Sequence, residues 1–208
     1  NPRFQSSAEK PVSMYVGDFD NNGRIEQIVT SYNKEKAYPM VLRHDLLAAL
    51  PYLKKKYLKY ASYKEEGIED IFSPEQLKKA HRLDMYVQQS SVFLNGQNGT
   101  FTRKSLPTEA QFSPMYGIAV EDFDGDGCAD ILMGGNFYQA KPEVGIYDAS
   151  YGAFLKGDGK GGFTVPIQKK SGFFSRGAIR DISVLKRKDN KIILITKNNE
   201  NIQIAEYE

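Results

Sequence analysis

Two short acidic segments carry the residues of this sequence that are best suited to chemistry, and both follow the pattern D-x-D-x-[DN]-G-x-x-[DE]. We call residues 18–26 loop 1 and residues 122–130 loop 2. A curled loop with side-chain oxygens at every second position directs those oxygens to one point. The oxygen-bearing residues are Asp18, Asp20, Asn22 and Glu26 in loop 1, and Asp122, Asp124, Asp126 and Asp130 in loop 2.

The crowding of three or four carboxylates costs Coulomb energy unless a cation lies among them. A hard divalent cation prefers oxygen ligands, and the number and flexibility of these donors favour calcium over magnesium. Gly23 and Gly127 permit the positive φ of a sharp turn, after which the backbone carbonyls of Arg24 and Cys128 can also face inward. We predict calcium at both loops, and tighter binding at loop 2, because loop 1 replaces one carboxylate with Asn22 and lies near the charge of Arg24.

Neither loop fits an EF-hand, because the twelfth position, which should hold a bidentate Glu, is Val29 in loop 1 and Met133 in loop 2. The ninth position, Glu26 or Asp130, supplies the late carboxylate instead, and the flanking segments resemble strands rather than helices. A solvated acidic turn is the alternative to a metal site. The matching context of both copies favours metal binding, with a structural role for the ion.

The strands that must position these loops form a repeated unit. Each loop lies between two short apolar runs, and each unit ends in a glycine-rich hairpin, at residues 92–101 and 153–163. The units extend over residues 13–106 and 116–167, and a degenerate third unit, whose turn lacks the alternating acidic residues, covers 178–208. We predict that residues 1–208 form a single, mainly β domain.

The first unit contains an insertion at residues 43–87 with helical character. Good helix formers occupy residues 45–50, Pro51 can begin a second helix, and Ser73, Pro74 and Gln76 form an N-cap signature. We predict a small helical excursion on a β scaffold, without a large core of its own.

The segment from Val120 to Leu132 resembles the signature of FG-GAP/VCBS repeats, the blades of a β-propeller family, and residues 155–163 resemble the closing hairpin of that family. Integrin α-subunit propellers use the same repeat, with calcium in the loops. The layout is similar to the C-terminal part of large bacterial surface or secreted proteins, some of which carry an ASPIC/UnbV domain. The resemblance implies calcium-stabilised blades, an extracytoplasmic location and no catalytic residues.

The number of units predicts an incomplete propeller. The chain has room for about three blades, whereas closed propellers have four to eight. Three blades leave open sheet edges, which native proteins cover. We therefore expect the rest of a larger propeller, or another chain, to complete the sheet packing.

The amino-acid composition argues against several classes of function and site. The 208 residues carry 28 Lys and Arg against 26 Asp and Glu, which is too balanced to indicate nucleic-acid binding. One cysteine and two histidines argue against a disulfide framework, a multi-cysteine zinc site and a histidine-rich metal site. No apolar run is long enough for a membrane helix. The start of the sequence lacks Met and a leader-like run, so we expect a processed product or a fragment.

Together these features predict a non-enzymatic scaffold or recognition module that binds a protein or a glycan. The alternatives are a polysaccharide lyase or hydrolase site hosted by the propeller, and a purely structural spacer. Several aromatic residues could either pack between blades or form a sugar-binding face, and the second arrangement would favour a glycan ligand. They are Tyr32, Tyr38, Phe137, Tyr138, Tyr147 and Tyr151.

Overall fold

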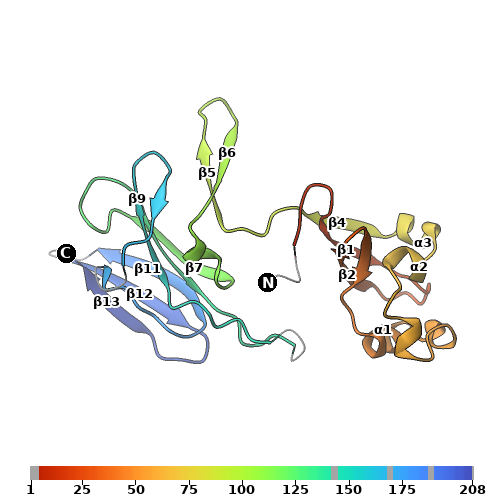
Figure 1. Ribbon diagram of the computed structural model, residues 1–208. Coiled ribbons are helices and arrows are strands. Elements are labelled where there is room, and N and C mark those ends of the chain that lie inside the picture. The colour runs from red at the N-terminus through yellow and green to blue at the C-terminus, as the bar shows by residue number, and fades with distance from the viewer. Residues whose placement is uncertain (1–4, 142–144, 168–170, 187–189, 208) are drawn as a thin grey trace. The chain divides into compact units, whose positions relative to one another are not determined.

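The computed structural model describes residues 5–141, 145–167, 171–186 and 190–207, and its described part is mainly β, as the sequence predicts (Figure 1). All strand pairs in its sheets are antiparallel. The contacts within the chain divide it into two compact units, residues 1–88 and 89–208. Each unit has its own sheets and its own core.

Unit 1 is built on a four-stranded sheet in the order β3-β2-β1-β4. Its strands are β1 (Val12–Gly17), β2 (Glu26–Asn33), β3 (Lys36–Pro39) and β4 (His81–Met85). Loop 1 is the connection between the central strands β1 and β2, whose register pairs Gly17 with Glu26. Strand β4 comes from the end of the 43–87 insertion and pairs with β1, so the insertion also contributes to the sheet.

The helices of unit 1 are short. They are α1 (Arg43–Ala49), the 3-10 helices η1 (Pro51–Lys55) and η2 (Tyr60–Ser62), α2 (Ile68–Ile71) and α3 (Pro74–Lys79). The predicted capping of α3 is confirmed, because Ser73 and Gln76 form a reciprocal capping box and Pro74 opens the helix. Helix α2 has no counterpart among the sequence-based predictions.

The insertion supplies most of the core of unit 1, in a single cluster that it shares with the sheet. The core cluster of unit 1 contains twelve buried residues, of which only Tyr15, Phe19 and Ile28 belong to the sheet and loop 1. The other nine come from the insertion: Leu46, Leu47, Leu50, Leu53, Tyr57, Tyr63, Ile68, Ile71 and Phe72. The apolar residues are spread over several short helices and turns, so no single stretch has the strong periodicity that reveals a core-forming helix.

Unit 2 contains a four-stranded sheet in the order β10-β9-β8-β7, and loop 2 connects β7 to β8. A three-stranded sheet in the order β11-β12-β13 corresponds to the predicted third unit and packs against the first sheet through Leu132, Ile182, Ile193 and Ile195. The strands are β7 (Met115–Glu121), β8 (Asp130–Gly135), β9 (Ala153–Gly157), β10 (Phe163–Thr164), β11 (Ile179–Lys186), β12 (Lys191–Lys197) and β13 (Gln203–Tyr207).

Both predicted glycine-rich hairpins form, but they are used differently. The hairpin β9–β10 joins the sheet through β8. The hairpin of β5 (Ser91–Asn95) and β6 (Phe101–Ser105) is a separate two-stranded sheet and extends from the rest of unit 2 (Figure 1). The 3-10 helix η3 (Thr108–Gln111) follows the β5–β6 hairpin. Its Ala110 is buried against the face of β8 and β9 that points away from the three-stranded sheet.

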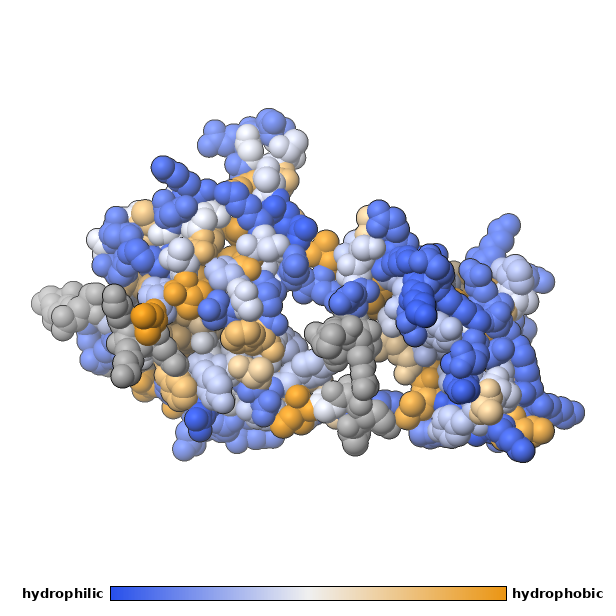
Figure 2. Space-filling view, viewed as in Figure 1, coloured by the Kyte–Doolittle hydropathy of each residue, from blue (hydrophilic) through white to orange (hydrophobic). Residues whose placement is uncertain are grey.

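Hydrophilic residues cover much of the face seen in Figure 2, with hydrophobic residues among them singly and in small groups. Exposed hydrophobic side chains occur on strands at sheet edges. On β7 these are Tyr116, Ile118 and Val120, and on β4 they are Leu83 and Met85.

Candidate metal centres

Loop 1 is organised around the carboxylate of Asp18. Its Oδ1 accepts a hydrogen bond from the backbone N–H of Asn22 at 3.0 Å, and its Oδ2 accepts one from Gly23 at 2.8 Å. These backbone donors, above all Gly23, lower the pKa of Asp18. The φ of Gly23 is +83°, which confirms the predicted glycine turn. The loop is therefore curled with its first carboxylate ionised.

One of the other side-chain oxygens of loop 1 is buried and has no hydrogen-bond partner. Glu26 Oε2 accepts a hydrogen bond from the backbone N–H of Phe19 at 3.1 Å, and Asn22 Oδ1 accepts one from Arg24 at 2.7 Å. Asp20 Oδ1 is buried and has no hydrogen-bond partner. A buried carboxylate oxygen without a partner is costly, and a cation bound in the loop would satisfy it.

The helical segment of unit 1 supports loop 1 from outside. Gln76, in the capping box of α3, donates from Nε2 to the carbonyl oxygen of Phe19 at 2.7 Å and to the hydroxyl of Tyr52 at 3.2 Å. Desolvation raises the pKa of Tyr52, and the charges of Asp20 and Glu26 act in the same direction. The insertion thus fixes the loop backbone next to its acidic residues.

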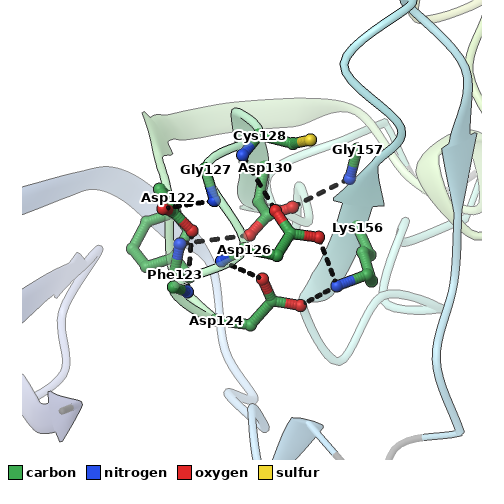
Figure 3. Close-up of polar contacts among 10 residues, drawn as sticks. Asp122, Phe123, Asp124, Asp126, Gly127, Cys128, Asp130, Lys156 and Gly157 are labelled. Carbon is green, nitrogen blue, oxygen red and sulfur yellow. Dashed lines mark hydrogen bonds and ion pairs between the residues drawn. The ribbon is translucent and has the colours of Figure 1, made fainter.

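Loop 2 repeats this arrangement in unit 2 (Figure 3). Asp122 accepts hydrogen bonds from the backbone N–H groups of Gly125 and Gly127 at 2.7 and 2.9 Å. Asp126 Oδ1 accepts one from Cys128 at 2.8 Å, and Asp124 Oδ1 accepts a longer one from Asp126 at 3.3 Å. Gly127 has the same φ of +83° as Gly23, and Gly125 and its counterpart Asn21 also have positive φ.

Asp130 connects loop 2 to the neighbouring strand. Its side chain is fully buried, Oδ2 accepts a hydrogen bond from Phe123 at 3.1 Å, and Oδ1 accepts one from the backbone N–H of Gly157 on β9 at 2.8 Å. A Cβ at position 157 would lie only 2.1 Å from the carbonyl oxygen of Ala129, so only glycine allows β9 to approach this closely. The sequence-based predictions did not assign Gly157, whose hairpin position was the available signal.

Lys156 is a second residue that the sequence analysis did not assign to the site. Its ammonium group forms ion pairs with Asp124 and with Asp126, the latter at 2.7 Å between Nζ and Oδ2 (Figure 3). These pairs raise the pKa of Lys156, and the pair with Lys156 is the main cause of the lowered pKa of Asp126. The lysine is distant from the loop in sequence, so only the pairing of β8 with β9 places it there.

The predicted donors converge in each loop, but not completely. Carboxylate oxygens of Asp18, Asp20 and Glu26 lie within 4.8 Å of one another, as do those of Asp122, Asp124 and Asp130. Asp126 is outside this group and faces Lys156. The backbone carbonyls of Arg24 and Cys128, expected to face inward, and the amide of Asn22 remain predicted ligands.

The Cys128 side chain lies next to the hairpin turn at Gly159, and desolvation raises the pKa of its thiol. A protonated thiol is a poor nucleophile and a poor ligand. In each loop the three converging donors are oxygens, and in loop 1 one oxygen is buried without a partner. This set of donors fits a hard, oxygen-preferring divalent cation, and calcium would be held by these side chains as a structural ion.

Comparison with known proteins supports the repeat assignment. Residues 67–133 match the family model of the FG-GAP-like repeat, and the matched segment includes all of loop 2. The resemblance to FG-GAP/VCBS repeats is thus confirmed for this part of the chain. No curated protein and no solved structure gave a significant match. Among the described residues, no helix has the length and apolar character needed to cross a membrane.

Proposed function

We propose that the chain is a calcium-stabilised, propeller-type repeat module that acts as a non-enzymatic scaffold or recognition element of a bacterial surface or secreted protein. The unpartnered, buried Asp20 Oδ1, next to two further converging carboxylates, carries the calcium part of this proposal. Extracytoplasmic calcium concentrations suit loops of modest affinity. The FG-GAP-like match supports the repeat architecture.

The proposed module is completed by further blades or by another chain. Strand β7 is hydrogen-bonded only to β8 within its sheet, and its Gly117 packs against Ile182 of β11. Tyr116, Ile118 and Val120 are exposed on the opposite face of β7, and Ile204 is 64% exposed on β13, an edge strand of the three-stranded sheet. Exposed apolar side chains on β7 and on the edge strand β13 favour packing against another β element.

A cleft in unit 1 favours a glycan as the recognised ligand, with a protein as the alternative. Its volume is about 610 Å³, and Tyr32, Tyr38, Asn33, Glu65 and Glu66 are among the residues that line it. Aromatic rings beside amide and carboxylate groups suit sugars, which present both apolar faces and hydroxyl groups. Tyr32 and Tyr38 belong to the aromatic set expected from the sequence.

The experiment that tests the calcium role is thermal unfolding in excess calcium and in chelator. A ligand that binds only the folded state adds about 2.7 kcal/mol when its free concentration is a hundredfold above Kd. The wild type should therefore melt several degrees higher in calcium. Asp20→Asn and Asp122→Asn should each reduce this difference, and the exposed control Asp148→Asn should not. Equal melting in calcium and chelator would refute the calcium role.

The recognition role is tested on a glycan array and by turnover of polysaccharides. Binding that is lost in Tyr32→Ala and Tyr38→Ala, but kept when the exposed Tyr86 is changed to Ala, supports a glycan ligand in this cleft. Cleavage of a polysaccharide would instead favour the lyase or hydrolase alternative. If neither binding nor turnover is found, a pull-down separates a protein ligand from a purely structural spacer.

A further inference from the structure

The ammonium group of Lys156 lies where a cation would balance loop 2. Strand β9 pairs with β8 through Leu155 and Ile131, which brings the side chain of Lys156 to the acidic residues that precede β8. The ammonium contacts Oδ2 of both Asp124 and Asp126, from a side chain that is 38% exposed (Figure 3).

These contacts leave no free carboxylate oxygen in loop 2. Asp122 and Asp130 each accept two backbone hydrogen bonds. Asp124 and Asp126 each accept one backbone hydrogen bond and pair with Lys156 through the other oxygen. Asp124 is also one of the three converging donors, so a divalent cation at this point must compete with Lys156 for it.

We propose that Lys156 is the internal counter-ion of loop 2, which holds the loop in shape without metal and must be displaced when calcium binds. This inference rests on the proposed calcium function. One positive charge reduces the net charge of the four carboxylates, and its displacement subtracts from the binding energy of calcium. The charge of the loop alone predicts that loop 2 binds more tightly than loop 1, and Lys156 works against that order.

The other hairpin shows that a lysine is not required at this position for the turn to form. In β5–β6 the matching residue is Asn95, between Leu94 and Gly96, and its side chain accepts a hydrogen bond from the backbone N–H of Gln97 at 2.9 Å. Loop 1 has no equivalent lysine among the described ion pairs, and there Asp20 Oδ1 is unpartnered. The hairpin fold therefore does not explain Lys156, whereas the acidic loop does.

Calcium titration followed by NMR of backbone amides tests the proposal at each loop separately. The Gly23 N–H donates to Asp18 and the Gly127 N–H donates to Asp122, so the two signals report loop 1 and loop 2. Lys156→Met removes the charge and keeps the aliphatic stem. The calcium concentration for half-saturation at Gly127 should fall about tenfold, with no change at Gly23.

Lys160→Met is the matched control, because Lys160 lies on the turn of the same hairpin, is exposed and carries the same charge. Lys160→Met should leave both titrations as in the wild type. Lys156→Arg keeps a cation, so its calcium concentration for half-saturation at Gly127 should be closer to the wild-type value than that of Lys156→Met. In chelator, Lys156→Met should accelerate hydrogen exchange at Gly127, and Lys160→Met should not.

The outcomes separate the two proposals. The wild type, Lys156→Met and Lys160→Met could all show the same calcium concentration for half-saturation at Gly127. That result would overturn the role of Lys156 and leave the calcium function intact. A wild type without any calcium response at Gly23 or Gly127 would overturn both. Unchanged exchange at Gly127 of Lys156→Met in chelator would overturn the counter-ion role, whatever calcium does.

Discussion

Loop 1 and loop 2 have the same spacing of acidic residues and the same glycine conformation, yet they balance their charges differently. In loop 2 Lys156 pairs with two carboxylates, and every carboxylate oxygen has a partner. In loop 1 the supporting hydrogen bond comes from a neutral group, the Gln76 side chain, which also donates to Tyr52, and Asp20 Oδ1 has no hydrogen-bond partner. Similar local sequences can thus have different needs for a metal ion, which depend on what the following segment brings beside the loop.

The largest effect of a single substitution should come from the close approach of the β9–β10 hairpin to loop 2. Gly157→Ala places a methyl group against the backbone of Ala129, which must move, and we expect a loss of about 3 kcal/mol in the free energy of unfolding. The matched change is Gly96→Ala in the β5–β6 hairpin. The two atoms nearest to its added methyl group belong to the side chains of Thr100 and Asn98, and the nearest backbone atom, Thr100 O, is 3.3 Å away. This change should cost less than about 1 kcal/mol. Denaturant unfolding in chelator measures both, and equal losses would contradict the difference between the hairpins.

A smaller effect should distinguish the ninth residues of the two loops. Asp130→Ala leaves two backbone N–H groups without their acceptor in a buried place, which should cost about 2 kcal/mol. Glu26 is only partly buried and accepts a single described hydrogen bond, from Phe19, so Glu26→Ala should cost about 1 kcal/mol. Both values refer to unfolding in chelator. A larger loss of unfolding free energy for Glu26→Ala than for Asp130→Ala would show that the ninth residue contributes more to stability in loop 1 than in loop 2.

The insertion connects the comparison with the fold of unit 1. Because the insertion supplies most of the buried cluster, deletion of residues 45–85 should abolish the sheet of unit 1 rather than leave it intact. The milder Gln76→Ala removes the donor to Phe19 O and should destabilise unit 1 by about 1 kcal/mol. Circular dichroism and hydrogen exchange on strands β1 and β2 report both. Protected β1 and β2 amides in the deletion variant would contradict this account of the core.

The smallest effect in the absence of metal should come from Asp20→Asn. Removal of the charge from a partly buried side chain with an unpartnered oxygen should change the stability in chelator by less than about 0.5 kcal/mol. In calcium the same variant should lose stabilisation of unit 1. Calorimetry in both conditions provides the comparison, and a large loss in chelator would mean that Asp20 has a structural partner.

Much of the site could be predicted from the sequence because it is local. The pattern from Asp18 to Glu26 contains its own turn glycine and its own backbone donors, so the curl of the loop can be predicted from this segment alone. Strands β11, β12 and β13 were predictable for a similar reason, since each is a short segment that contains Ile and other strand-favouring residues and lacks Gly and Pro. The helix N-cap at Ser73 is also a local signal.

Contacts between distant segments could not be predicted in this way. Lys156 reaches loop 2 only through the register of β8 with β9, and Gln76 reaches loop 1 only through the packing of α3. The core of the insertion is spread over short helices and turns, and strand β4 pairs with β1 from the far end of that insertion. In each case the decisive partner is far away in sequence.

The most direct test of the central claim is a high-resolution crystal structure grown with calcium, with anomalous scattering to identify the ion. The account predicts one calcium ion in each loop, bound by Asp18, Asp20 and Glu26 in loop 1 and by Asp122, Asp124 and Asp130 in loop 2, with the Lys156 ammonium moved away from Asp124. Maps in which both loops hold no ion and the Lys156 pairs persist would contradict it.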